Sequence, residues 1–244
     1  MIETFIALLL AHVCADFLLQ PDDLAQAKQR RAPLALLLHG VIVLATATAT
    51  LAPKDAAGVI PLLALTGVHL LIDIAKTWAN PTSLRAFLLD QVAHLASLIA
   101  LTILIPDLAA TGAWGGITPL PALMALLAGA VIATQAGGYA IGLLVRPYGR
   151  SFRAEGLPKG GQLIGLLERG LIYFFILVGQ PSAVGFLIAA KSVLRFDASK
   201  RKQKAAEYVI IGTLASFGWA VICAYATLAL LEQVPPLGIG AARP

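Results

Sequence analysis

The stretch GVIPLLALTGVHLLIDIAKT, residues 58–77, decides the fold class of this sequence. Residues 58–72 contain no Asp, Glu, Lys or Arg, and the whole stretch has the ~20 residues that a helix needs to cross a bilayer core of ~30 Å. Its apolar residues form a continuous run and do not alternate with polar ones. It therefore predicts a transmembrane helix and not a strand of a membrane barrel.

Other segments of the chain have the same character. They are 2–20, 33–52, 87–105, 119–145, 162–179, 182–196 and 205–232. We predict an all-α polytopic bundle of about eight spans, or seven if 162–179 and 182–196 form one broken span around Gly179-Gln180-Pro181. The expected organisation is a four-helix domain over 1–118, a four-helix region over 119–235 and a flexible tail over 236–244.

The composition supports a membrane protein. Of the 244 residues, 59% are hydrophobic and 13% are charged, whereas a soluble domain has about 25% charged residues. This excludes a soluble enzyme and a disordered chain. Cys14 and Cys223 both lie in apolar segments, which gives no disulfide framework. The basic residues lie mainly between the spans, so the net charge of +5 indicates no nucleic-acid partner, and membrane lipid is the expected one.

The distribution of Lys and Arg predicts an orientation. These residues concentrate in the alternate loops 21–32, 76–86, 146–161 and 191–204. Because cytoplasmic loops carry the excess of basic residues, we expect these loops in the cytoplasm and both termini outside. The expected location is a bacterial inner membrane.

All histidines of the chain lie inside predicted spans, and three of them have an aspartate four residues away. The pairs are His12 with Asp16, His69 with Asp73, and His94 with Asp90, while His39 has no such partner. A spacing of four puts both side chains on one helix face. In the predicted topology, all these groups lie at a similar depth near the cytoplasmic ends of the first four spans.

Imidazole and carboxylate groups are ligands of zinc, iron and manganese. We therefore predict an intramembrane divalent metal site, with zinc as the first candidate, and all seven groups are candidate ligands. A catalytic zinc takes about three protein ligands and a water, so the surplus could hold a second metal or orient a histidine. Asp16, Asp73 and Asp90 are also candidate catalytic bases. The alternatives are a proton relay without metal, structural polar packing and, for His39, a hydrogen-bonded helix contact.

Further charged groups near the cytoplasmic ends of the spans are candidate contacts for a phosphate or a similar anion. The cations are Lys76, Arg169, Lys191 and Arg195, and the neighbouring carboxylates Glu168 and Glu207 are further candidate substrate-binding residues. The alternative for the C-terminal members is neutralisation of buried charge by an Arg169–Glu207 or a Glu168–Lys191 ion pair.

Four motifs resemble a known family. AHVCADFLLQ (11–20), LLLHG (36–40), GVHLLIDIAK (67–76) and DQVAHL (90–95) are similar, in this order, to the bacterial membrane proteins grouped as domain of unknown function 3307. The resemblance covers about half of the chain, and the C-terminal half looks like an extension found in longer members. It implies the helical fold and the polar constellation, to which it adds Gln20 and Gln91 as candidate substrate-binding residues, but it implies no reaction.

The leading functional prediction is a metal-dependent membrane hydrolase acting on a lipid or lipid-linked substrate. A proton- or ion-coupled transporter is the second hypothesis, and it requires polar groups along the whole membrane depth. A non-catalytic scaffold or sensor is the third, and it requires no metal.

Overall fold

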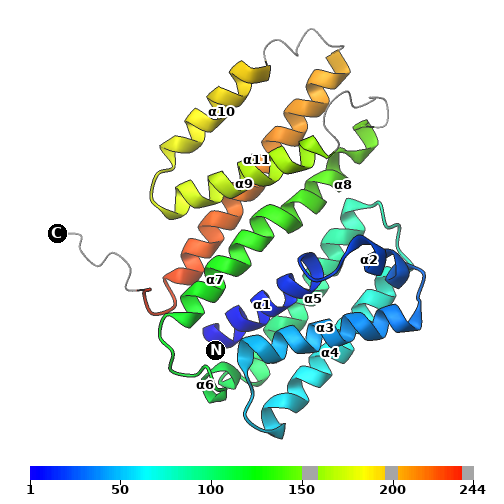
Figure 1. The fold of residues 1–244 in the computed structure, drawn as a ribbon, viewed down its shortest axis with the longest axis vertical. Coiled ribbons are helices and arrows are strands. Elements are labelled where there is room, and N and C mark those ends of the chain that lie inside the picture. Colours follow the sequence, from blue (N-terminus) through cyan, green and yellow to red (C-terminus); the bar gives the residue numbers. More distant parts are fainter. Residues whose placement is uncertain (150–158, 196–202, 238–244) are drawn as a thin grey trace, which may run out of the picture. The chain divides into compact units, whose positions relative to one another are not determined.

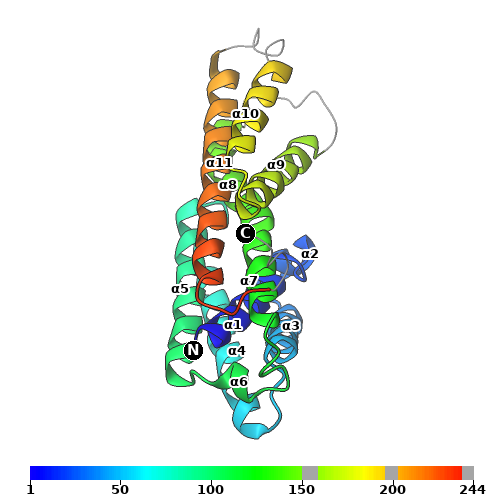
Figure 2. The same cartoon turned by 90° about the vertical axis from the view of Figure 1, so that its left-hand side faces the viewer.

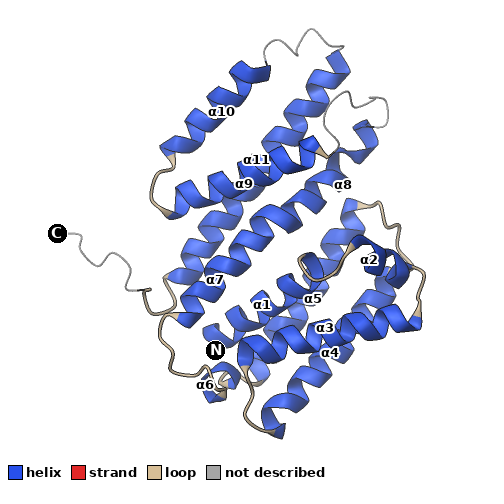
Figure 3. Ribbon diagram, viewed as in Figure 1, coloured by secondary structure: helices blue, strands red, loops and turns tan. Residues whose placement is uncertain are grey.

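The computed structural model describes residues 1–149, 159–195 and 203–237, and this part of the chain contains helices and no strand (Figure 3). The predicted all-α fold class is confirmed. In the first half of the chain the helices are α1 (Ile2–Phe17), α2 (Asp22–Gln29), α3 (Pro33–Leu51), α4 (Ala56–Lys76), α5 (Leu84–Leu104) and α6 (Leu108–Thr111). The second half holds α7 (Leu120–Val131), the π-helix η1 (Ile132–Ala136), α8 (Gly137–Gly149), α9 (Gly160–Leu177), α10 (Ser182–Arg195) and α11 (Gln203–Leu231).

The stretch that decides the fold class forms α4, and its boundaries follow from local signals. The Asp55 side chain accepts a hydrogen bond from the Gly58 backbone N–H (3.0 Å), which caps the start of α4. Ser83 caps α5 in the same way through the Ala86 N–H (3.3 Å). At the end of α3, Ala52 adopts a left-handed conformation (φ 45°) that ends the helix. Short connections therefore join α3, α4 and α5.

The chain divides into two compact units, and the first comprises Met1–Val131 with Ala229–Pro244. Within this unit α1 packs against α3, α5 and α7 (Figures 1 and 2). Its residues Ile6, Leu8 and Ala15 are at most 1% exposed. The central position of α1 explains why polar residues near its C-terminal end are buried in protein and do not face lipid.

The predicted first span, 2–20, is interrupted. Helix α1 ends at Phe17, and α2 follows at an angle of 89° to it. Helix α2 is polar, with the sequence DDLAQAKQ, and it packs on α3 and α4. With its 16 residues, α1 is shorter than the ~20 that cross a bilayer.

Within the described residues, six helices are long and apolar enough to cross a membrane, and a seventh span results if α1 and α2 count as one. They are Pro33–Leu51, Ala56–Lys76, Leu84–Leu104, Leu120–Tyr148, Gly160–Leu177 and Glu207–Leu231. The larger of these counts equals the lower predicted count of seven, but the bent pair is α1 with α2 and not the predicted pair 162–179 with 182–196. The difference from eight lies partly in α10, whose apolar part, Ser182–Ser192, is short.

The outer faces of these helices are apolar. Leu34 and Leu104 are 77% exposed and Leu89 is 70% exposed. In contrast, the histidines of α3, α4 and α5 are buried. Apolar residues outside and polar residues inside are expected when lipid is the solvent. The chain is thus a multi-pass membrane protein by its helices. Its orientation and its particular membrane stay predictions.

The second unit, Ile132–Leu228, contains the π-helix. A π-helical turn changes the backbone pairing, and here two of its carbonyl groups accept hydrogen bonds from side chains. Arg169 donates from Nε (3.2 Å) and Nη2 (2.8 Å) to the Thr134 carbonyl, and Trp219 Nε1 donates to the Ile132 carbonyl (3.0 Å). A Cβ atom at Gly138 would lie 2.8 Å from Arg169 Nη2, so this position has little room for a side chain.

Candidate metal centre

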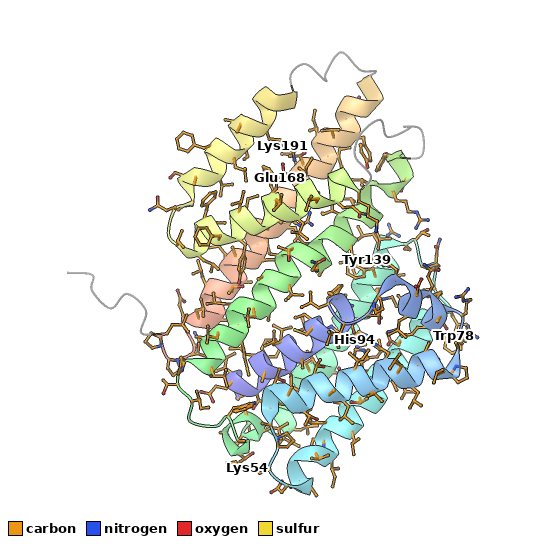
Figure 4. The ribbon with its side chains drawn as sticks, viewed as in Figure 1. Lys54, Trp78, His94, Tyr139, Glu168 and Lys191 are labelled. Atoms are coloured by element: carbon orange, nitrogen blue, oxygen red, sulfur yellow. The ribbon has the colours of Figure 1, made fainter. Side chains whose placement is uncertain are left out.

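Four helices of the first unit bring the seven predicted ligands together. His12 and Asp16 come from α1, His39 from α3, His69 and Asp73 from α4, and Asp90 and His94 from α5. The three His–Asp pairs each lie one turn apart on one helix face, as their spacing predicts. Apart from Asp16, whose side chain is 10% exposed, these residues are at most 7% exposed, and Figure 4 shows His94 inside the unit.

The most compact group of ligand atoms comprises Asp16, His39 and His69. Asp16 Oδ1 lies 3.3 Å from His39 Nε2 and 3.3 Å from His69 Nε2, and the two Nε2 atoms are 3.0 Å apart. In a tetrahedral zinc site with bonds of ~2.0–2.1 Å, neighbouring ligand atoms are about 3.3 Å apart. These three atoms therefore have the spacing of one face of such a site.

Asp73 lies beside this group. Its Oδ2 atom is 3.3 Å from His39 Nε2 and 3.7 Å from His69 Nε2, and its Oδ1 atom is 4.0 Å from His94 Nε2. On the far side, Asp90 Oδ1 lies 3.5 Å from His94 Nε2. Asp73, Asp90 and His94 thus form another set whose ligand atoms lie within 4.8 Å of one another.

His12 belongs to a third set, with His69 and His94. Its ring lies 4.9 Å from the His94 ring between centroids, and its Nε2 atom is 3.3 Å from Gln91 Oε1. The third set shares His69 with the first and His94 with the second.

Two lysines neutralise part of the carboxylate charge. Lys28 Nζ lies 2.5 Å from Asp73 Oδ2, and Lys76 Nζ lies 2.6 Å from Asp90 Oδ2. The Asp90 Oδ2 atom also accepts a hydrogen bond from Gln91 Nε2 (3.0 Å). Of these groups, Lys76 is the most open to the surroundings, with a side chain that is 31% exposed.

Several nitrogen and oxygen atoms of the cluster are buried without a hydrogen bond to any described residue. They are His12 Nδ1, Asp16 Oδ1, His39 Nδ1, Asp90 Oδ1, His94 Nδ1 and His94 Nε2, and Gln20 Oε1 is in the same condition. A buried polar group without a partner costs about 1–3 kcal/mol. Native proteins pair nearly all such groups, so their concentration here makes the cluster a candidate site for a further ligand.

Sequence reasoning missed Lys28. Its place in the polar segment 21–32 suggested a loop cation that contributes to membrane orientation. Instead, the 89° bend after α1 lays α2 against α3 and α4, and Lys28 is 7% exposed at Asp73. The amphipathic pattern of α2 is the signal that could have indicated a packed helix.

The C-terminal candidate residues belong to the second unit. Lys191 Nζ lies 2.6 Å from Glu168 Oε2, which is one of the two ion pairs considered as alternatives to anion binding, and Figure 4 shows the two residues on α9 and α10. Arg169 Nη1 also donates to Ser216 Oγ (3.2 Å). Arg195 ends α10 and its side chain lies outside the described residues, while Glu207 lies on α11. The predicted tail 236–244 falls mostly outside the described part of the chain.

The fold and the cluster define a helical membrane protein with a buried His/Asp constellation. Residues 4–113 match the family model described as "Protein of unknown function (DUF3307)", which confirms the predicted resemblance for this part of the chain. The matched range contains all seven clustered residues as well as Lys28 and Lys76. Comparisons with curated proteins and with solved structures find no significant match.

Proposed function

We propose that the protein is a metal-dependent membrane enzyme that hydrolyses a lipid or lipid-linked phosphate ester. The observation that carries this proposal is the buried group of Asp16 Oδ1, His39 Nε2 and His69 Nε2, with separations of 3.0–3.3 Å. Imidazole and carboxylate atoms at this spacing suit a divalent ion, with zinc as the first candidate and iron or manganese as alternatives.

Three protein ligands leave a coordination position open for water. A divalent ion held there would make a bound water nucleophilic near neutral pH, so the site would need no serine or cysteine. Asp73 and Asp90 each form an ion pair with a lysine through one carboxylate oxygen, and the other oxygen faces His94. Each can therefore ligate an ion or accept the proton of the attacking water.

The proposed contact for the phosphate group is Lys76. It is the most exposed of the charged groups at the cluster, and its ammonium group forms an ion pair with Asp90. Gln91, which bridges His12 and Asp90, positions both side chains. The ion pair of Glu168 with Lys191 favours the structural alternative for these two residues, and they are not part of the proposed site.

A proton- or ion-coupled transporter is the second candidate. The adjacency of two Lys–Asp pairs and four histidines favours it, since such chains of titratable groups carry protons in membranes. However, the threonines further along the helices do not extend this network. The hydroxyls of Thr46, Thr66 and Thr102 each donate to a carbonyl of their own helix.

Hydrolysis assays test the proposal. Protein purified in detergent and loaded with zinc or manganese should release phosphate or an alcohol from at least one class of phospholipid or lipid-linked phosphate, and chelator should abolish the reaction. The His69→Ala variant should be inactive, while Thr102→Ala, on a buried polar residue of α5, should retain activity. Metal-free protein that carries out pH-driven ion uptake in liposomes would favour the transporter instead.

A further inference from the structure

The cluster offers more ligand atoms than one ion can use. We infer that it is a dinuclear centre in which the Asp73 carboxylate bridges two divalent ions. This inference rests on the proposed metal site and specifies its composition. The first ion is held by Asp16, His39 and His69, and the second by Asp73, Asp90 and His94. These two sets share no residue.

The orientation of Asp73 supports the bridge. Its Oδ2 atom faces the first set, 3.3 Å from His39 Nε2, while its Oδ1 atom faces His94 Nε2 of the second set at 4.0 Å. A carboxylate with its two oxygens on different ligand sets is the arrangement that joins the ions of a two-metal site, which lie ~3.5–4 Å apart.

The second set contains polar atoms that a single ion would leave without partners. Asp90 Oδ1 and His94 Nε2 lie 3.5 Å apart, both are buried, and neither has a hydrogen bond among the described residues. An ion in the first set would satisfy Asp16 Oδ1 but would leave these two atoms unpaired. An ion between them satisfies both.

The lysines leave one oxygen of Asp73 and one oxygen of Asp90 available for the second ion. Lys76 forms an ion pair with Asp90 Oδ2, so Asp90 Oδ1 remains for the second ion. Lys28 forms an ion pair with Asp73 Oδ2, so Asp73 Oδ1 also remains for the second ion. Lys28 and the first ion then share Asp73 Oδ2. The histidine His12 lies outside both sets, and its Nε2 contact with Gln91 Oε1 assigns it a positioning role beside His94.

The charge balance favours an anionic substrate. Three carboxylates and two ammonium groups sum to −1 when the four imidazoles are neutral. Two divalent ions raise the sum to +3, an excess of positive charge in a buried site that an anionic group must balance. A phosphate ester provides this charge, and its oxygens can bind both ions.

Metal stoichiometry tests the inference on the full chain in detergent. After saturation with Mn²⁺ and removal of free ion, wild type and Thr102→Ala should hold about two ions per chain. Because the two ions share a bridge, their electron paramagnetic resonance spectrum should show spin coupling and not the signal of isolated Mn²⁺. Asp90→Asn and His94→Ala should each retain about one ion with an uncoupled signal, and the retained ion reports that the bundle has folded.

Each outcome is decisive. One ion per chain in saturated wild type, unchanged in Asp90→Asn and His94→Ala, would overturn the dinuclear centre and leave the mononuclear site of the proposed function standing. No bound ion in wild type would overturn both. Two ions without spin coupling would overturn the Asp73 bridge.

Discussion

His39 and His69 lie on the neighbouring helices α3 and α4 with their Nε2 atoms 3.0 Å apart, and Asp16 Oδ1 lies 3.3 Å from each. Two imidazoles that face each other can share only one hydrogen bond, and the carboxylate oxygen beside them has none to a described residue. An ion among the three atoms satisfies all of them. This relationship makes His39, which has no aspartate partner in sequence, a central member of the candidate site.

Replacement of His39 tests its place in the site. We predict that His39→Ala lowers the affinity for Zn²⁺ by at least about tenfold, because the loss of a ligand should cost no less than the loss of a group that orients one. Equilibrium titration with a zinc indicator measures the affinity. The control is Thr102→Ala. Equal zinc affinity in wild type and His39→Ala would mean that His39 is no ligand and only forms a contact between helices.

Removal of Lys28 tests the buried ion pair with Asp73. Lys28→Met leaves the Asp73 carboxylate buried without its ammonium partner, and breaking a buried pair in this way costs about 3–5 kcal/mol. We predict a lower midpoint of thermal unfolding in detergent for metal-free protein. Lys54→Met is the matched control, because Lys54 is exposed in the connection between α3 and α4.

The double variant distinguishes this effect from a general loss of packing. If the two groups are coupled, Lys28→Met with Asp73→Asn should lower the midpoint by less than the sum of the single changes. Strictly additive effects would show that the pair is not coupled in the folded protein.

Metal removal should destabilise the wild type selectively. Because an ion that binds only the folded state stabilises it by mass action, chelator should lower the thermal midpoint of zinc-loaded wild type. The same treatment should lower the midpoint of His69→Ala by less, because this variant lacks a ligand of the first ion. A chelator effect of equal size in both proteins would mean that the stabilising ion binds elsewhere.

Two glycines of α8 test the hydrogen bonds of Arg169 to the Thr134 carbonyl in the π-helix. A Cβ atom at Gly138 would lie 2.8 Å from Arg169 Nη2, whereas nothing lies within 4 Å of a Cβ atom at Gly142. We predict that Gly138→Ala is destabilising and that Gly142→Ala is neutral or stabilises by up to ~1 kcal/mol, the usual gain of helical alanine over glycine. Thermal unfolding compares the two variants. Equal midpoints would contradict the close packing of Arg169 against Gly138.

The sequence was sufficient to predict the helical fold class and which His and Asp side chains come together, for physical reasons. Long apolar runs have one stable form in lipid, and a spacing of four residues puts His12 and Asp16, or His69 and Asp73, on one face whatever the packing is. The shared depth of the groups followed from the order of the spans. What periodicity could not show was that Asp73 has oxygens facing two different sets, since this depends on side-chain rotamers.

Other features depend on tertiary structure. The bend after Phe17 turns a polar segment back onto the bundle, so Lys28 changes from an apparent loop cation to a partner of Asp73. The π-helix inside the predicted span 119–145 has no hydropathy signal, because it changes backbone pairing and not composition.

The most direct test of the central claim is the metal content of protein purified in detergent without chelator. Elemental analysis should be made on wild type, His69→Ala and Thr102→Ala side by side, before and after reconstitution with zinc, iron and manganese. The account predicts at least about one ion per chain in wild type and Thr102→Ala, and about one ion per chain less in His69→Ala, which lacks a ligand of the first ion. Wild type without metal even after reconstitution, or His69→Ala with the metal content of wild type, would contradict it.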